Sequence, residues 1–300
     1  LLRILTEIYP SELVLSYSSE IMYHKMIHLI ARLNHVAPAP YAVKSYGKYM
    51  AVPFGKVLEG TAVPNTVTKA LHTEKYFYED ISGFTIEERS YYSTLENQIR
   101  TIRSFNRPVI LVDDLLHKGY RMKEIDPILK ANGVVVADTV VGVQTGRGRD
   151  LMTLKERSVD SAYFLPNLKC WIDESALYPY IGGDSMKAKG MPVAVCDLIP
   201  SLNLVLPFAI PSFLGNISNA HYYDFSMTAL TNARDILKTL EEEYQKTFEQ
   251  KLTLKRLGEV ITSPKNPDLL RHTSMDENMA ASDFVTMDIE KLIRMKKLFK

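Results

Sequence analysis

Apolar and polar residues follow one another along the first half of the chain in the order expected of a parallel α/β protein. A helical pattern runs over 21–33, where apolar residues recur about every 3.6 positions, and a short apolar run at 13–16 predicts a buried strand before it. Residues 41–77 are rich in Val, Thr and Tyr with glycines between them, which predicts two or three strands. Residues 85–105 predict a helix that ends before Pro108.

The middle of the chain carries the clearest strand-helix-strand pattern. The run Val109–Val112 is continuously apolar and β-branched, as in a central parallel strand that is buried on both faces. A helical pattern over 122–131 stops at Asn132-Gly133, and the run "VVVADTVVGV" at 134–143 supplies the next strand. Strands that alternate with helices in this way predict a parallel sheet with right-handed crossovers.

Beyond about residue 155 the pattern changes. Residues 163–214 are dense in Pro, Gly and aromatic side chains, and residues 222–257 predict one long amphipathic helix. A short basic helix is predicted over 287–300. We therefore expect an α/β domain over residues 1–160, followed by a Pro-rich and helical C-terminal extension or hood over residues 161–300.

Composition and charge narrow the classes of function. The formal net charge is +1, so we expect no general binding of nucleic acid through electrostatic attraction, while a local basic patch stays open. No apolar run approaches the ~20 residues that a membrane span needs, so we expect no membrane partner. Cys170 and Cys196 are interpreted as reduced thiols of a cytoplasmic protein. The chain begins at Leu1 without a Met or a signal peptide, so we expect a tag or an upstream domain before it.

The residues with the clearest chemistry lie in "VILVDDLLHKGYR" at 109–121. Asp113 and Asp114 follow a buried strand, and a loop that contains Gly119 leads into the next helix. Ligands of open parallel sheets bind outside the carboxyl ends of the strands, and loop amides with a helix N-terminus favour phosphate. Two carboxylates there could accept hydrogen bonds from a ribose diol and help to hold hydrated Mg²⁺. The alternative is a helix cap that follows a core strand.

This stretch resembles the phosphoribosyl pyrophosphate motif of type I phosphoribosyltransferases, in which four apolar residues and two acids precede a Gly-containing loop and a helix. The resemblance extends in element order over Glu12–Asp150. It implies that Asp113 and Asp114 contact the ribose hydroxyls and Mg²⁺. It also implies that the turn with Ser18 and Ser19 takes the place of the pyrophosphate loop. The 5-phosphate would then be bound by the loop residues Leu116, His117, Lys118, Gly119, Tyr120 and Arg121.

Two further segments lie near the same predicted edge. Lys69 and His72 stand in "TKALHTEKY", where the family has a mobile strand or hood, and they would grip pyrophosphate and act as general acid or base. The alternative for them is the exposed end of a polar hairpin. The segment "GVQTGRGRD" at 142–150 is interpreted as a mobile loop, with a cradle for base or phosphate as the alternative.

The resemblance implies a transferase that moves a 5-phosphoribosyl group between pyrophosphate and a base-like acceptor, with Mg²⁺ as cofactor and phosphoribosyl pyrophosphate or a related sugar phosphate as ligand. The loop at 116–121 departs from the family, because its residues are bulky and cationic where the family has small Thr, Gly and Ser. A non-catalytic or regulatory module that binds a ribose phosphate or nucleotide therefore stays open. Residues 171–184 are interpreted as core and turn packing, with a hood over the base or a homodimer contact as the alternatives. A nucleotide hydrolase has less support, since the sequence has no GxxxxGK[ST] motif.

Overall fold

The computed structural model describes residues 1–40, 46–187, 197–268 and 275–296. Contacts within the chain group it into two compact units. The parallel-sheet unit comprises Tyr17–Glu74 and Thr85–Lys169. The helical unit comprises Leu1–Ser16, Lys75–Phe84 and Cys170–Lys300. Neither unit is one uninterrupted stretch of sequence, because a hairpin leaves the parallel-sheet unit and returns to it.

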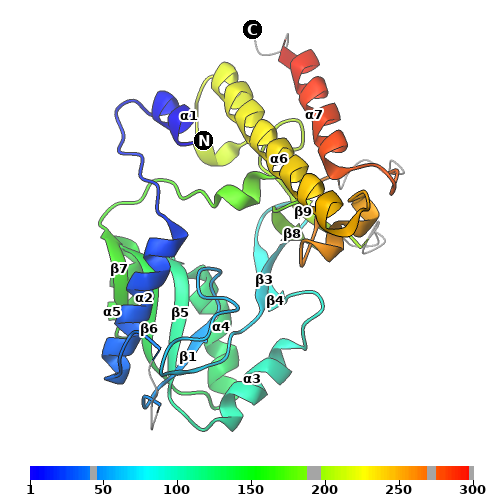
Figure 1. Ribbon diagram of the computed structural model, residues 1–300. Coiled ribbons are helices and arrows are strands. Elements are labelled where there is room, and N and C mark those ends of the chain that lie inside the picture. The colour runs from blue at the N-terminus through cyan, green and yellow to red at the C-terminus, as the bar shows by residue number, and fades with distance from the viewer. Residues whose placement is uncertain (41–45, 188–196, 269–274, 297–300) are drawn as a thin grey trace. The chain divides into compact units, whose positions relative to one another are not determined.

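The parallel-sheet unit is built on a five-stranded sheet in the order β2-β1-β5-β6-β7, in which every neighbouring pair is parallel (Figure 1). β5 is the central strand. The strands are β1 (Met50–Pro53), β2 (Val67–Thr68), β5 (Val109–Leu116), β6 (Val136–Thr145) and β7 (Asp160–Leu165). The helices of this unit are α2 (Ser19–Asn34), α3 (Leu95–Ser104), α4 (Tyr120–Ala131) and α5 (Gly146–Leu154).

The core of this unit explains why its elements form where they do. Residues 109–112 of β5 are buried on both faces of the sheet, as a continuously apolar strand must be. Met26 and Ile30 of α2 pack in one apolar cluster with Ile110 and Val140 of the central strands. The burial of these side chains at helical spacing fixes which face of α2 meets the sheet.

α2 runs antiparallel to β7. Arg32 near the end of α2 pairs with Asp160 at the start of β7, with 2.9 Å between Nη2 and Oδ2. Tyr17, just before α2, packs against Tyr163 late in β7, with ring centroids 4.7 Å apart. The start of α2 therefore lies near the carboxyl end of the sheet.

The helical unit has its own core, and a small mixed sheet takes strands from both units. Its core gathers buried side chains of α6 and α7, such as Phe225, Leu237 and Leu292. The helices are α1 (Leu2–Ile8), α6 (Asn219–Phe248) and α7 (Ala281–Met295), with 3-10 turns η1 (Glu174–Leu177), η2 (Ser212–Leu214) and η3 (Leu254–Glu259). The sheet order is β10-β9-β8-β3-β4, formed by β3 (Thr73–Phe77), β4 (Phe84–Glu88), β8 (Asp184–Met186), β9 (Ile199–Leu202) and β10 (Lys265–Asn266).

The predicted fold class is confirmed: a parallel-sheet α/β core is followed by a Pro-rich and helical C-terminal extension. Cys170 is a free thiol, while Cys196 lies outside the described residues. None of the helices in the described part of the chain has the length and apolar character needed to span a membrane.

Three local predictions were wrong. Residues 13–16 form no strand, and Leu13 is 83% exposed, because this short apolar run has no partner strand beside it. The helix predicted over 85–105 is split into β4 and α3, since Phe84 and Ile86 follow the two-residue period of a strand. The segment 142–150 is the end of β6 and the start of α5, so it is not a mobile loop in this structure.

Candidate functional site

The carboxyl edge of the parallel sheet gathers the segments that follow its strands. These are residues 54–57 after β1, 69–72 after β2, 117–119 after β5, 146–148 after β6 and 166–169 after β7. All of them meet at one edge because the strands are parallel, and this edge is where open α/β sheets bind ligands.

The acid pair lies within the central strand and does not follow its end. β5 continues for two residues beyond Asp114, to Leu116. Asp113 is only 2% exposed, whereas Asp114 is partly exposed, because successive side chains of a strand point to opposite faces. The two carboxylates therefore have different surroundings.

Asp113 is paired with Arg121, a residue predicted to bind phosphate. Arg121 Nη1 donates to Asp113 Oδ1 at 2.6 Å, and the same oxygen accepts from the backbone N–H of Asp114 at 2.9 Å. Arg121 also donates to the carbonyl of Phe54 and lies over its ring, 4.8 Å from the centroid. The guanidinium thus connects the central strand to the segment after β1.

Asp114 holds the same segment from its other side. Its Oδ2 accepts from the N–H of Lys56 at 2.6 Å, and its Oδ1 accepts from the N–H of Val57 at 3.0 Å. A Cβ on Gly55 would lie 2.6 Å from Asp114 Oδ1, so only glycine fits there. Burial and the neighbouring Asp113 raise the pKa of Asp114 to about 6, against the opposing effect of the two N–H donors.

Gly55 and Lys56 were missed by the sequence reasoning. The signal that could have found them is "AVPFGK" at 51–56, in which an apolar run ends in Gly-Lys. This pattern resembles "VILVDD", an apolar run that ends in polar residues, and β1 pairs with β5 in parallel register. The structure thus places the segment after β1 in contact with the acid pair.

The pair does not fit a directly bound Mg²⁺ in this conformation. Three of its four carboxylate oxygens already accept hydrogen bonds from groups of this chain. Among the described residues no cluster of three or more His, Cys, Asp or Glu side chains could hold a metal ion.

α4 begins without a side-chain cap. Gly119 occupies the N-cap position with φ 68°, and no side chain accepts a hydrogen bond there. Ser18, Thr94 and Thr145 cap the other helices of the unit, α2, α3 and α5, through their hydroxyl oxygens. The first-turn N–H groups of α4 therefore keep the direction and partial charge that attract an anion. Tyr120 is exposed beside them.

A cationic hollow of about 480 Å³ opens beside this loop. His117 Nδ1 lies 3.0 Å from Thr145 Oγ1 at its wall. Burial lowers the pKa of His117, and the charges of Lys118 and Arg147 lower it further. Leu116, predicted to be part of the phosphate loop, is instead the buried last residue of β5. The residues that line the hollow are His117, Lys118, Thr145, Arg147, Pro166, Asn167, Leu168 and Lys169.

Lys69 and His72 lie in the short connection between β2 and β3. The N–H of Lys69 donates to the carbonyl of Ala51 at 3.1 Å, as part of the sheet. His72 Nδ1 lies 3.0 Å from Glu59 Oε1, and its ring stacks on Tyr92 with centroids 3.9 Å apart. The imidazole is held by these groups, and its acid-base role stays a prediction.

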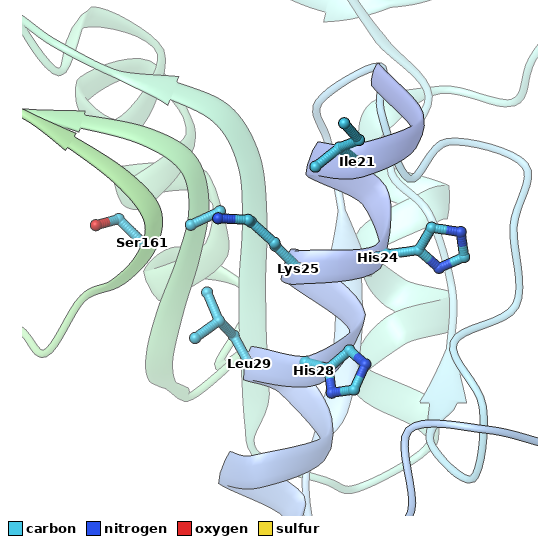
Figure 2. Close-up of a pocket in the computed structure, with 7 residues that line it drawn as sticks. Ile21, His24, Lys25, His28, Leu29 and Ser161 are labelled. Carbon is cyan, nitrogen blue, oxygen red and sulfur yellow. The ribbon is translucent and has the colours of Figure 1, made fainter. Parts of the chain in front are cut away.

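Ser18 and Ser19 lie exposed at the start of α2, where Ser18 Oγ accepts from the N–H of Ile21 at 3.4 Å. A second hollow, of about 500 Å³, runs along α2 and β7. In Figure 2, His24 and His28 project from the same side of α2, while Lys25 and Leu29 project toward the strand that carries Ser161. None of the predicted site residues lines this second hollow.

Comparisons with known proteins add little to what the geometry of the site shows. No protein-family model matches the chain, and no curated protein matches it. One solved structure with similarity is an adenine phosphoribosyltransferase from Thermoanaerobacter pseudethanolicus, with a TM-score of 0.29 and 14% identity. The match covers 48% of this chain and 80% of that chain. A likeness at this level assigns no family, so the site must be judged on its own residues.

Proposed function

We propose that the carboxyl edge of the parallel sheet binds a ribose phosphate. The observation that carries this proposal is the sequence of groups along one short stretch. Two carboxylates lie on the central strand, and five residues after Asp114 comes Gly119, where a helix begins without a side-chain cap. Carboxylates recognise a diol, and an uncapped helix start recognises phosphate.

Arg121 connects the proposed diol site at the carboxylates with the proposed phosphate site at the start of α4. Its guanidinium, 22% exposed at the side chain, pairs with Asp113. A phosphate at the start of α4 would compete for the guanidinium, because Arg binds phosphate with the same forked geometry that it uses for carboxylate. As Arg121 turned to the phosphate, Asp113 would be released to accept hydrogen bonds from the ribose hydroxyls.

The chemistry that we propose for this site is transfer of a phosphoribosyl group from pyrophosphate to a base-like acceptor. Such a reaction needs positioning of the sugar and stabilisation of charge on the leaving group, and it needs no protein nucleophile. Lys56, beside the acid pair, and Lys69, after β2, supply cations at the same edge of the sheet.

A non-catalytic module is the second candidate, and a specific observation favours it. Both carboxylates are engaged by the chain itself, Asp113 by Arg121 and Asp114 by two backbone N–H groups. A pair that fastens the segment after β1 to the central strand would bind ligand only by giving up these contacts. Binding without turnover is the function expected if that exchange stops short of a reactive geometry.

Calorimetric titration of the full chain with ribose 5-phosphate, and with phosphoribosyl pyrophosphate and Mg²⁺, tests the proposal. Asp113→Asn should weaken binding at least tenfold, since a charged hydrogen bond is worth about 1.5–3 kcal/mol. Asp126→Asn is the matched control: it breaks another ion pair, with Arg157 at 2.6 Å, on α4. Equal affinities of wild type and Asp113→Asn would contradict the proposal.

Pyrophosphate release with a panel of bases separates the two candidates. Release that needs Asp113 supports the transferase. Tight binding by the wild type with no release for any base supports the module.

A further inference from the structure

The cationic hollow after β5, β6 and β7 is walled by tightly packed backbone. The N–H of Gly146 donates to the carbonyl of Pro166 at 3.2 Å, and a Cβ on Gly146 would lie 2.5 Å from that oxygen. A Cβ on Gly148 would overlap the carbonyl of Leu116. A Cβ on Gly119 would overlap the side chain of Leu151 in α5. Glycine at 146 and 148 lets the start of α5 pack directly on the backbone after β7 and on that of β5, so these walls of the hollow are fixed.

Cations from three different segments converge on these walls. Lys118 follows β5, Arg147 lies at the start of α5 and Lys169 follows β7. No Asp or Glu lines the hollow in the described part of the chain. The whole chain carries a formal net charge of only +1, so this concentration of positive charge is local. The charges of Lys118 and Arg147, held close to each other by these segments, repel one another, and a bound anion relieves that repulsion.

Two backbone donors at the start of α5 are already used, so we assign the binding to side chains. Thr145 Oγ1 accepts from the N–H of Gly148 at 3.2 Å, and Gly146 donates to Pro166. The start of α5 is therefore capped, in contrast to that of α4. An anion in the hollow would be held by Arg147 and Lys118, with the amide of Asn167 as a further polar group on the wall.

We propose that this hollow binds the oxyanion of a small organic molecule, a carboxylate or a phosphate, as a site separate from the one for the ribose phosphate. A volume of about 480 Å³ exceeds the needs of a free ion and falls within the range of small-molecule pockets. The inference rests on the proposed function only in placing the ribose phosphate at α4. Within that function it means that the acceptor is an anion and not a neutral base.

The distance along the strand between Asp114 and His117 suits the binding of two reactants, the sugar and its acceptor. His117, at the wall of the hollow, follows Asp114 by three residues, which is ~10 Å along an extended strand. That distance accommodates a sugar beside the acid pair and an acceptor beyond it.

Inorganic phosphate and acetate, titrated into the ¹⁵N-labelled full chain, are the probes. The expected result is a saturable shift of the Gly146 and Gly148 amide resonances. Tighter binding of phosphate than of acetate would mark a phosphoryl group as the natural anion, and the reverse order would mark a carboxylate. Arg147→Gln should weaken the binding at least tenfold, as loss of a charged hydrogen bond does.

Arg149→Gln is the matched control for this test. Arg149 lies two residues further along α5, is also exposed, and stacks over Phe164 at 4.9 Å without lining the hollow. Its loss should leave the affinity for both probes unchanged. Equal weakening by both substitutions would mean general charge attraction and would overturn the inference, as would the absence of any shift at Gly146 and Gly148 in the wild type.

Ribose 5-phosphate, titrated in parallel, distinguishes this inference from the proposed function. We expect it to bind together with inorganic phosphate and to keep its affinity in Arg147→Gln. If Arg147→Gln weakens it as much as inorganic phosphate, the hollow holds the sugar's own phosphate and a separate site is overturned. If ribose 5-phosphate never binds while phosphate still requires Arg147, the proposed function fails and the anion site stands.

Discussion

Arg121 Nη1 and Asp113 Oδ1 lie 2.6 Å apart, so two residues that the sequence motif assigns to different parts of a ligand are each other's partner. The carboxylate is almost fully buried, and the guanidinium also holds the carbonyl of Phe54. The acid pair therefore has a structural role as well as any role in binding. Each substitution there must be measured for both stability and affinity.

Arg121→Gln should lower the free energy of unfolding by about 2–4 kcal/mol, because it leaves the buried Asp113 carboxylate without its cation. This range lies below that of a fully buried pair because the arginine is partly exposed. Urea denaturation measures the change. Arg100→Gln, which removes an exposed pair with Glu96 on α3, serves as control and should cost less than about 1 kcal/mol.

The stability of the protein should depend on Asp114 between about pH 4 and pH 7. Folding raises the pKa of Asp114 from 3.8 to about 6, so the native state binds this proton more tightly than the unfolded state does. Its contribution to stability is therefore greatest below the unfolded pKa and is lost as the pH rises through the folded pKa. The difference in unfolding free energy between wild type and Asp114→Asn should accordingly move in favour of the variant as pH rises. Parallel pH profiles for the two proteins would show that the carboxyl is not shifted.

Gly148→Ala should destabilise the protein, although alanine at an exposed helix position usually stabilises by roughly 0.5–1 kcal/mol. The added Cβ would overlap the carbonyl of Leu116, which is backbone of the central strand and cannot move away easily. Thermal unfolding measures the effect. Gly258→Ala is the control, since its Cβ would meet only Pro264 Cγ, at 3.9 Å. A gain of stability in Gly148→Ala would contradict the close packing of α5 on β5.

Inorganic phosphate should raise the pKa of His117. Burial and the charges of Lys118 and Arg147 lower that pKa in the free protein, and an anion in the hollow would favour the charged imidazolium. Proton NMR titration of the imidazole, assigned with His117→Gln, measures the shift. His221, in the helical unit, should not respond to phosphate. A His117 titration curve that phosphate leaves in place would argue against an anion beside it.

The elements that could be predicted from the sequence are those whose burial requires several consecutive residues to be apolar. The run Val109–Val112 identified the central strand because both of its faces are covered. β4 could not be separated from the following helix, since it is an edge strand of five residues with only Ile86 buried, too short to show a clear two-residue period.

The candidate site was likewise predictable only in part. The sequence located the acid pair on a central parallel strand, because an apolar run stops at Asp113. The sequence does not show that Arg121 pairs with Asp113, because an arginine eight residues after the carboxylate could equally well face a ligand. The contact of Asp114 with Lys56 and Val57 depends on the pairing of β1 with β5, which no local pattern encodes.

The outer part of the hairpin of β3 and β4, Lys75–Phe84, lies outside the parallel-sheet unit, which the chain leaves after Glu74 and re-enters at Thr85. At its base the N–H of Arg89 donates to the carbonyl of His72 at 2.9 Å, so the outgoing and returning chains are neighbours. Such an excursion has the topology of an insertion: a short turn could close the gap without rerouting the sheet. Two further junctions, Ser16 to Tyr17 and Lys169 to Cys170, would then mark the ends of a single-unit protein in which the carboxyl edge can be studied alone.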